Sequence, residues 1–233
     1  MALLVTGSSG QVGRAVSAVL EARGDRVRRF DLAVGDDLRD PVAVREAADG
    51  CSAIVHAGAL AHDTAGTPED IVATNVGGTW HVLRAAEHAR ARRVVVFSSG
   101  QVFGCAEGEG EPEHLPIDDD HPLRAARPYG MSKRMVEEMC EAWTARTGIP
   151  TVVLRPVLIL DDDGLATTAE AEVELGAFVH VDDVVRATVR ALDVDLSGHH
   201  RLLLCGPGSF DAGRAEDVLG WAPRRGWPGP ITR

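Results

Sequence analysis

The sequence contains 233 residues, of which 45% are hydrophobic and 25% are charged, a composition typical of one medium-sized globular domain. Its net charge of −11 argues against a nucleic-acid partner and against binding to an anionic membrane, because both surfaces repel an acidic protein. No leader and no membrane-spanning apolar stretch is recognisable, and the cysteines are scattered, so we expect a cytoplasmic protein with reduced thiols.

Short apolar runs alternate with longer amphipathic segments over the first two thirds of the chain. The runs predict strands at 2–6, 26–31, 53–56, 93–98 and 151–155. The amphipathic segments predict helices at 11–22, 42–48, 69–89 and 129–146. This alternation predicts an α/β fold, a Rossmann-type doubly wound parallel sheet with helices on both faces.

The last third of the chain is less regular. It predicts strands at 178–181 and 201–205 and a helix at 183–192. The tail from Gly206 is rich in Gly, Pro and Arg, and we expect it to pack loosely.

A glycine-rich loop connects the first strand to the first helix, with glycines at Gly7, Gly10 and Gly13. Glycines in such a loop permit a tight turn, a close approach of backbone to a pyrophosphate and close packing of helix on strand. The helix N-terminus then offers N–H groups and a positive dipole end to phosphates. Because the strand and helix flank it correctly, the loop predicts a dinucleotide site rather than an ordinary strand-to-helix turn.

Asp31 ends the second predicted strand, at the distance expected for a carboxylate that binds ribose. A carboxylate there accepts hydrogen bonds from ribose hydroxyls and repels a 2′-phosphate, so NAD is favoured over NADP. Arg28 and Arg29 lie just before Asp31 and would weaken this preference if they faced the same ribose.

Tyr129 and Lys133 are four residues apart on a predicted helix and therefore share one helix face. A free tyrosine has a pKa of about 10, and a nearby ammonium lowers the pKa of a phenol by stabilising its charged form. Such a phenol exchanges a proton with an alcohol near neutral pH. Tyr129 is also the only tyrosine of the sequence, which favours a functional role over that of a structural tyrosine beside a surface lysine.

Further segments fit the same interpretation, namely 35–40, 55–59, 75–79, 97–104, 128–133, 154–156, 178–183 and 219–221. Together they resemble the extended short-chain dehydrogenase/reductases, the NAD-dependent epimerase/dehydratase family. The resemblance implies NAD as cofactor and a catalytic set of Ser99, Tyr129 and Lys133, in which Ser99 hydrogen-bonds the reacting oxygen. It implies cofactor binding by Gly7, Ser9, Gly10, Gln11, Val12, Gly13, Asp31, Asp37, Leu38, Ala57, Gly58, Ala59, Asn75, Ser98, Tyr129, Lys133, Pro156 and Val157.

We therefore divide the chain into a dinucleotide-binding Rossmann core, residues 1–156, and a small C-terminal substrate-binding appendage, residues 157–233. Within the appendage, residues 181–205 are expected to return partly to the core. This region departs from the family, because only 77 residues follow Pro156. Gly176 and Ala177 stand where relatives carry Arg-Asp, whose arginine binds a nucleotide-sugar phosphate. Gln101 stands where dehydratases carry a catalytic acid, which disfavours dehydration.

We expect an enzyme that transfers hydride, with NAD, at a secondary alcohol or ketone of a sugar-like or other small polar substrate. A nucleotide-sugar 4-epimerase and a non-catalytic dinucleotide-sensing regulator are the alternatives. The uronate dehydrogenases, short members of the family, are loosely similar. The acidic run 161–163 lies at the expected substrate mouth and would disfavour an anionic substrate, unless it is simply a solvated loop. The sensor alternative is disfavoured because such relatives lose the tyrosine–lysine pair.

The remaining expectations concern metal binding and packing. The nine histidines show no spacing typical of metal ligands, so no metal is predicted. Met131, Met135, Met139 and Trp143 recur every four residues, and we expect this stripe to lie in the core. The family resemblance implies that the two long helices pair across a dimer axis, which makes a homodimer a hypothesis.

Overall fold

The computed structural model describes residues 2–105, 109–168 and 178–225. Its centre is a six-stranded sheet in the order β2-β1-β3-β4-β5-β8, and each neighbouring pair is parallel. The strands of this sheet are β1 (Ala2–Thr6), β2 (Arg26–Phe30), β3 (Ala53–His56), β4 (Val94–Phe97), β5 (Thr151–Pro156) and β8 (His199–Leu204). The predicted Rossmann-type doubly wound α/β fold is therefore confirmed.

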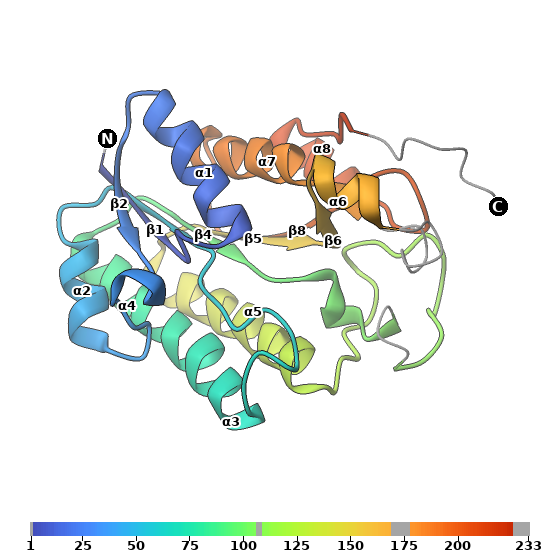
Figure 1. Ribbon diagram of the computed structural model, residues 1–233, viewed down its shortest axis with the longest axis horizontal. Coiled ribbons are helices and arrows are strands. Elements are labelled where there is room, and N and C mark those ends of the chain that lie inside the picture. The colour runs from blue at the N-terminus through green and yellow to red at the C-terminus, as the bar shows by residue number, and fades with distance from the viewer. Residues whose placement is uncertain (1, 106–108, 169–177, 226–233) are drawn as a thin grey trace.

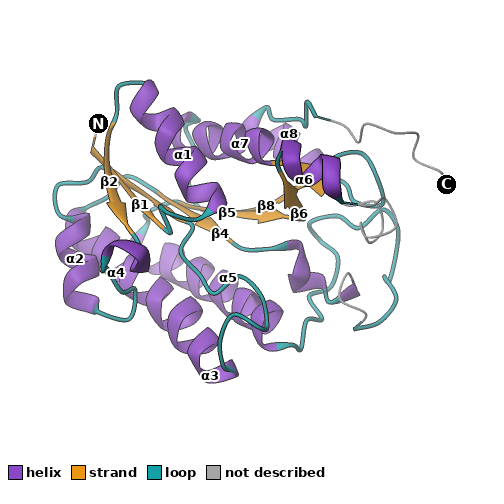
Figure 2. Cartoon of the chain, in the orientation of Figure 1, coloured by secondary structure: helices purple, strands orange, loops and turns teal. Residues whose placement is uncertain are grey.

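Helices cover both faces of this sheet, as Figures 1 and 2 show. One face carries α1 (Gln11–Ala22), α7 (Val181–Asp193) and α8 (Gly213–Leu219). The other carries α2 (Pro41–Ala48), α4 (Gly78–Ala89) and α5 (Pro128–Thr147). The strands are apolar on both faces because each face meets a helical layer; all four residues of β4 are buried valine or phenylalanine.

The register of the sheet brings four loops to one edge. Thr6 at the end of β1 pairs with His56 at the end of β3, and Phe97 at the end of β4 pairs with Leu154 near the end of β5. The residues that follow these strands consequently lie side by side at the carboxyl edge, where ligands bind in open parallel sheets. They include the glycine loop, Ala57, Ser98 and Val157.

A small second sheet lies beyond β5. It consists of β6 (Leu158–Leu160) paired in parallel with β7 (Phe178–His180), and the short helix α6 (Asp162–Thr167) follows β6. Neither β6 nor α6 is predicted from the sequence. Two later elements return to the main body, since α7 packs against α1 and β8 pairs with β5.

The expectation that the tail from Gly206 packs loosely is wrong for the part that the structure describes. This segment forms α8, and Trp221 after it is 1% exposed. The Trp221 indole N–H donates to the Asp183 carbonyl at 2.8 Å, which fixes the segment against α7. One large side chain with a satisfied polar group thus holds a stretch whose composition suggests a loop.

The predicted helix at 69–89 is helical throughout, but its geometry is not uniformly α-helical. The chain forms α3 (Pro68–Ile71), then a π-helical turn (Val72–Gly77), and only then α4. A π-helical turn places one extra residue in a helical turn, and such turns are frequent at functional sites.

The expected core packing of the methionine stripe on α5 is wrong for its first members. Met131 is 36% exposed and Met135 is 43% exposed. The helix instead buries a face that includes Ser132, Lys133 and Glu137.

None of the helices in the described part of the chain combines the length and the apolar character that a membrane span requires.

Candidate active site

The glycine loop after β1 is shaped by close backbone contacts. A Cβ on Gly7, whose φ is +67°, would lie 2.5 Å from the Gly58 nitrogen, and a Cβ on Gly13 would lie 2.1 Å from the Gly7 carbonyl oxygen. Gly10, the N-cap of α1, meets only one atom within 4 Å, and no side chain caps the helix. Gly7 and Gly13 therefore serve packing, whereas Gly10 leaves the helix N-terminus open for an anionic group.

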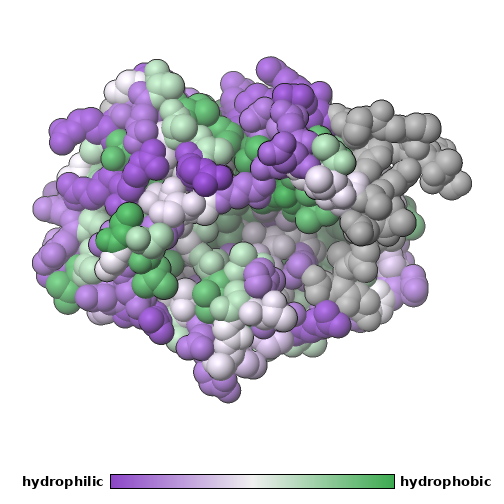
Figure 3. All heavy atoms as spheres, viewed as in Figure 1, coloured by the Kyte–Doolittle hydropathy of each residue, from purple (hydrophilic) through white to green (hydrophobic). Residues whose placement is uncertain are grey.

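A cavity of about 620 Å³ opens in front of this loop. It lies between the two helical layers, where Figure 3 shows a hollow in the surface. Its wall includes Asp31, Asp37 and Leu38 in addition to the glycine loop. This volume is within the range of cofactor sites.

Asp31 is held by backbone donors at the end of β2. Its carboxylate accepts hydrogen bonds from the N–H groups of Ser9 and Ala33, each at 2.9 Å. The two neighbouring arginines turn elsewhere: Arg28 donates to carbonyl groups at the end of α2, and Arg29 pairs with Glu21. Asp31 thus presents a carboxylate to the cavity, and neither arginine binds it.

Asp37 and Leu38 form the wall of the cavity beyond Asp31. Asp37 makes an ion pair with Arg39 at 2.6 Å, and the hydrogen bonds from Arg39 lower the pKa of Asp37. Leu38 packs so closely that a Cβ on Gly58 would lie 2.8 Å from its Cδ1. Leu38 therefore gives this end of the cavity an apolar surface that suits a flat aromatic ring.

A second cavity, of about 790 Å³, adjoins the first and shares Gln11, Val12, Ala57 and Ala59 with it. The three predicted catalytic residues, Ser99, Tyr129 and Lys133, line it together. Ser99 comes from the end of β4, and Tyr129 and Lys133 come from the first turns of α5. The Ser99 oxygen accepts the Gln101 N–H at 3.2 Å, a bond that leaves the hydroxyl proton to be donated.

Lys133 is buried, with 6% of its surface exposed. Its ammonium donates to the Phe97 carbonyl at 2.8 Å and lies 5.7 Å from the centre of the Tyr129 ring. Burial lowers the pKa of Lys133 to about 8, because the charged form loses its hydration. The ammonium is therefore near its titration range, yet charged at neutral pH, beside the phenol that it is expected to activate.

The backbone of Tyr129 is fixed by side chains from other segments. Its N–H donates to the Asp63 carboxylate at 2.7 Å, and its carbonyl accepts the Ser132 hydroxyl at 2.7 Å. Asn75 donates to the Ser132 oxygen at 3.0 Å and also bonds both backbone polar groups of Leu60. The start of α5 is thereby tied to the loop that follows β3.

The structure gathers almost all of the predicted site residues in the two cavities. The first cavity is lined by Gly7, Gly10, Gln11, Val12, Gly13, Asp31, Asp37, Leu38, Ala57, Gly58 and Ala59. The second adds Ser98, Ser99, Tyr129, Lys133, Pro156 and Val157. Ser9 and Asn75 line neither cavity; Ser9 bonds Asp31 and Asn75 bonds the backbone of Leu60, and both partners line the first cavity.

Several residues that line the second cavity are absent from the predicted set. His62 and Arg127 add polar side chains, and Leu158 and Ile159 of β6 add an apolar wall. His62 and Arg127 lie in loops without a regular pattern, so no sequence signal singles them out. Gln101, which the sequence places where dehydratases carry an acid, also lines this cavity.

The acidic run 161–163 does not line either cavity. Asp161 caps α6 by accepting the Gly164 N–H at 2.8 Å, and its other oxygen accepts the Gln11 amide at 3.5 Å. The run therefore lies beside the cavities, next to Gln11, and not in their lining. Gly176 and Ala177, where the sequence departs from the Arg-Asp pattern, lie outside the described residues.

Comparison with known proteins decides the family. The model of the NAD dependent epimerase/dehydratase family matches residues 3–160. The chain belongs to this family. Members with similar sequences include a uronate dehydrogenase of Pseudomonas syringae pv. tomato, 32% identical over 66% of this chain and 58% of the relative. A UDP-glucose 4-epimerase of Streptomyces lividans is 31% identical over 64% of this chain and 49% of the relative.

The structural comparison agrees with the family assignment. A short-chain dehydrogenase/reductase superfamily protein from Agrobacterium tumefaciens, solved with bound NAD, matches with a TM-score of 0.81 and 26% identity. The match covers 97% of this chain and 93% of that one. By contrast, the chain spans only 49% to 59% of the length of the first curated relatives.

Proposed function

We propose that this epimerase/dehydratase family member is an NAD-dependent oxidoreductase or epimerase that transfers hydride at a secondary alcohol or ketone of a sugar-like substrate. The observation that carries the proposal is the meeting of Ser99, Tyr129 and Lys133 in one cavity that opens into the glycine-loop cavity. The similarity to a uronate dehydrogenase and to a UDP-glucose 4-epimerase supports a sugar substrate.

The proposed proton chemistry uses groups that the chain itself supplies. The Tyr129 phenol exchanges a proton with the substrate oxygen, since the Lys133 ammonium 5.7 Å from its ring centre stabilises the phenolate. Ser99 donates its hydroxyl proton to the same oxygen and holds it in line. Leu158 and Ile159 form an apolar wall beside these groups.

The residues present fit NAD. Gly10 leaves room for a pyrophosphate at the N-terminus of α1, and the Asp31 carboxylate lies where ribose hydroxyls would be bound. NAD, when bound, supplies the hydride acceptor. NADP is disfavoured because Asp31 would repel a 2′-phosphate and because Arg28 and Arg29 are engaged elsewhere.

His62, Gln101 and Arg127 indicate how a sugar would be recognised. They supply hydrogen-bond donors around the second cavity, which suit the hydroxyl groups of a sugar. A free sugar or sugar acid is the preferred substrate class within the proposal, in line with the similarity to uronate dehydrogenase. A nucleotide sugar is the alternative, favoured by the similarity to UDP-glucose 4-epimerase.

A substrate panel tests this proposal. Sugars, sugar acids and nucleotide sugars are incubated with the protein and NAD, while NADH absorbance and product stereochemistry are followed. A net dehydrogenase releases NADH, whereas an epimerase inverts a stereocentre and retains its NAD through purification. A protein that binds NAD but turns over no member of the panel would instead support the dinucleotide-sensing alternative.

We also propose that the protein forms a homodimer. We further propose that it is located in the cytoplasm. Trp80 on α4 is 41% exposed and lies on the same helical layer as the exposed Met131 and Met135 of α5. The buried Cys51, Cys140 and Cys205 are free thiols, as in reducing compartments. Light scattering should give twice the chain mass, and Met135→Asp should shift the protein toward monomer. A wild-type chain that stays monomeric at high concentration excludes the dimer.

A further inference from the structure

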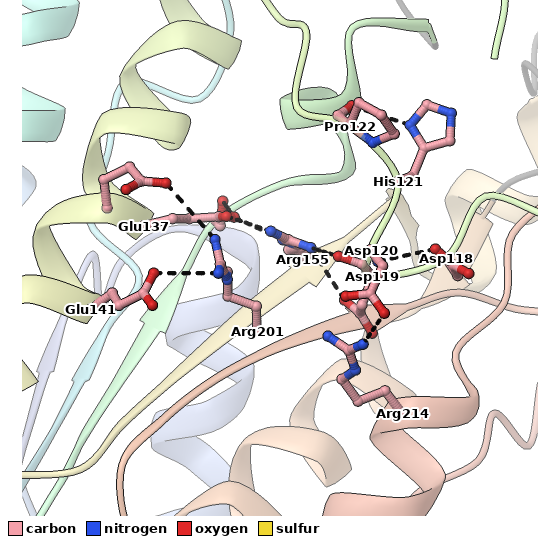
Figure 4. Close-up of polar contacts among 12 residues, drawn as sticks. Asp118, Asp119, Asp120, His121, Pro122, Glu137, Glu141, Arg155, Arg201 and Arg214 are labelled. Atoms are coloured by element: carbon pink, nitrogen blue, oxygen red, sulfur yellow. Dashed lines mark hydrogen bonds and ion pairs between the residues drawn. The ribbon is translucent and has the colours of Figure 1, made fainter. Parts of the chain in front are cut away.

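Glu137 is a carboxylate with no exposed surface, on the face of α5 that meets the sheet. It accepts one hydrogen bond from the Ser98 hydroxyl at 2.6 Å and two from Arg155, at 2.9 Å from Nε and 2.6 Å from Nη2. Figure 4 shows Glu137 and Arg155 facing each other from α5 and β5. A buried carboxylate persists only when its oxygens are bonded in this way.

Each partner of Glu137 belongs to a segment that lines the second cavity, the one that contains Ser99, Tyr129 and Lys133. Ser98 immediately precedes Ser99, and Arg155 immediately precedes Pro156. Glu137 itself lies one helical turn beyond Lys133, on the same face of α5. A single carboxylate therefore links the strand ends of β4 and β5 to the helix that carries the phenol and the ammonium.

Arg155 extends this link to the loop that leads into α5. Its Nη1 donates to the Asp119 carbonyl at 2.9 Å and lies 3.4 Å from the Asp119 carboxylate. Its guanidinium also lies 5.4 Å from the centre of the Phe103 ring. Arg155 is thus held from several sides and positions the Glu137 carboxylate in turn.

The groups around the Lys133 ammonium differ in charge. Burial lowers the pKa of His56 on β3 to about 3 and raises the pKa of Cys140 on α5 to about 12, so both are neutral at neutral pH. The Phe97 carbonyl offers only a dipole. Among the described residues, Glu137 supplies the negative charge that opposes the effect of burial on the pKa of Lys133.

The two other charged or titratable groups nearby act differently. Arg155 on β5 is a cation, but the Glu137 carboxylate stands between it and α5 and binds it directly. The phenol of Tyr129 is the group that the ammonium is proposed to activate. Loss of Glu137 would leave Arg155 with Asp119 as its remaining acidic neighbour and would leave the buried Lys133 ammonium without the nearby negative charge four residues along its helix.

We propose that Glu137 is a positioning residue of the catalytic site, whose carboxylate supplies the counter-charge for the buried Lys133 ammonium while it ties together the strand ends that carry Ser99 and Pro156. Glu137 lines neither of the two cavities and touches none of the reacting groups, so it acts through Lys133. Its effect on turnover rests on the proposed function, but its effect on the charge of Lys133 does not.

The composition of the chain makes this charge directly measurable, because Lys133 is the only lysine of the sequence. Protein made with isotopically labelled lysine gives one side-chain NMR signal, whose shift follows ionisation as the pH is raised. We expect a wild-type midpoint of about 8. In Glu137→Gln the midpoint should fall by about one pH unit or more, because the compensating charge is gone.

A matched control lies one turn further along the same helix. Glu141 is half exposed and pairs with Arg201 at 3.3 Å, as Figure 4 also shows. Glu141→Gln makes the same chemical change at a solvated position and should leave the Lys133 midpoint unchanged. An unchanged midpoint in folded Glu137→Gln, or equal shifts in the two variants, would overturn the proposal.

Glu137→Asp carries the test if Glu137→Gln does not fold. It keeps the negative charge but withdraws it from Lys133 by one methylene group, so the Lys133 midpoint should fall below the wild-type value; a midpoint at or above that value overturns the proposal. With an active substrate, the alkaline limb of kcat/KM should follow the NMR midpoint in each variant. A lowered midpoint in a protein inert toward every substrate would reject the proposed function and leave the assignment of Glu137 standing.

Discussion

The two helical layers of this molecule contribute to the cleft in opposite ways. Beyond its first turn, α7 buries mostly aliphatic side chains against the sheet, such as Val184, Ala187 and Leu192. In contrast, α5 buries Ser132, Lys133 and Glu137 against the other face. The α1/α7 layer borders the cavities through the backbone of the glycine loop, whereas the α5 layer contributes the side chains of Tyr129 and Lys133. The face covered by α1 and α7 therefore contributes mainly to stability, whereas the face covered by α5 contributes the side chains proposed to carry out the chemistry.

Removal of the phenol tests the α5 side and should have the largest effect. Tyr129→Phe keeps the ring but loses the exchangeable proton, so turnover should fall about 10³-fold. NAD affinity, measured by calorimetry, should change little, because the glycine loop belongs to the other layer. Unaltered turnover would remove Tyr129 from the mechanism and with it the chemical role of this layer.

Truncation in the α7 layer should lower stability without altering the site. Leu192 is fully buried, and Leu192→Ala should reduce the free energy of unfolding by about 3 kcal/mol. Urea denaturation measures the loss, and the NMR midpoint of Lys133 should stay at its wild-type value. Val19→Ala on α1, where the side chain is 44% exposed, is the control and should change stability by less than about 0.5 kcal/mol. A displaced Lys133 midpoint in Leu192→Ala would show that the layers are coupled.

Asp31, at the end of β2, presents a carboxylate to the cavity beside the glycine loop. Asp31→Ala should shift the ratio of NAD to NADP affinity about tenfold toward NADP, because a hydrogen bond to a charged group contributes about 1.5 kcal/mol. Asp36→Ala, on the wall of the same cavity but without the Ser9 and Ala33 bonds, should shift the ratio much less. A wild-type preference for NADP would show that the ribose argument is wrong.

The smallest effect is expected at Arg29. This exposed residue pairs with Glu21 at 2.9 Å, and such surface ion pairs contribute less than about 1 kcal/mol. Arg29→Ala should therefore change the free energy of unfolding by about 0.5 kcal/mol or less and leave the cofactor preference unaltered. A loss of NADP binding in this variant would place the arginine at the ribose after all.

The sequence predicted the sheet and most of its helices because buried strands of a parallel sheet are continuous apolar runs, as in β4. It misjudged α5, since the search for a core face followed Met131 and Met135, whereas the buried face is partly polar. Glu137 escaped notice for the same reason, although its four-residue spacing from Lys133 was a usable signal. Trp221 was hidden in a Gly- and Pro-rich tail, where composition suggests a loop but one anchored side chain decides the packing.

For the candidate site, too, the sequence predicted the motif residues but not the residues in irregular loops. The motif residues could be placed because their spacing follows the strand ends, and the two cavities contain nearly all of them. Their catalytic and binding roles stay predictions until the variants are measured. His62, Arg127 and Asp63 could not be placed, because they lie in loops whose course depends on tertiary contacts such as the Asp63 bond to Tyr129.

The π-helical turn Val72–Gly77 sets the rotational phase of the helix that follows it. One inserted residue rotates all later side chains by about 100° around the axis. Asp70 and Thr74 thus line the first cavity, while Val82 and Ala86 of α4 pack in the core. Deletion of a single residue from this turn would rotate polar positions of α4 onto the sheet. The π-helical turn therefore allows one continuous helical segment to face the cavity at its start and the core further along.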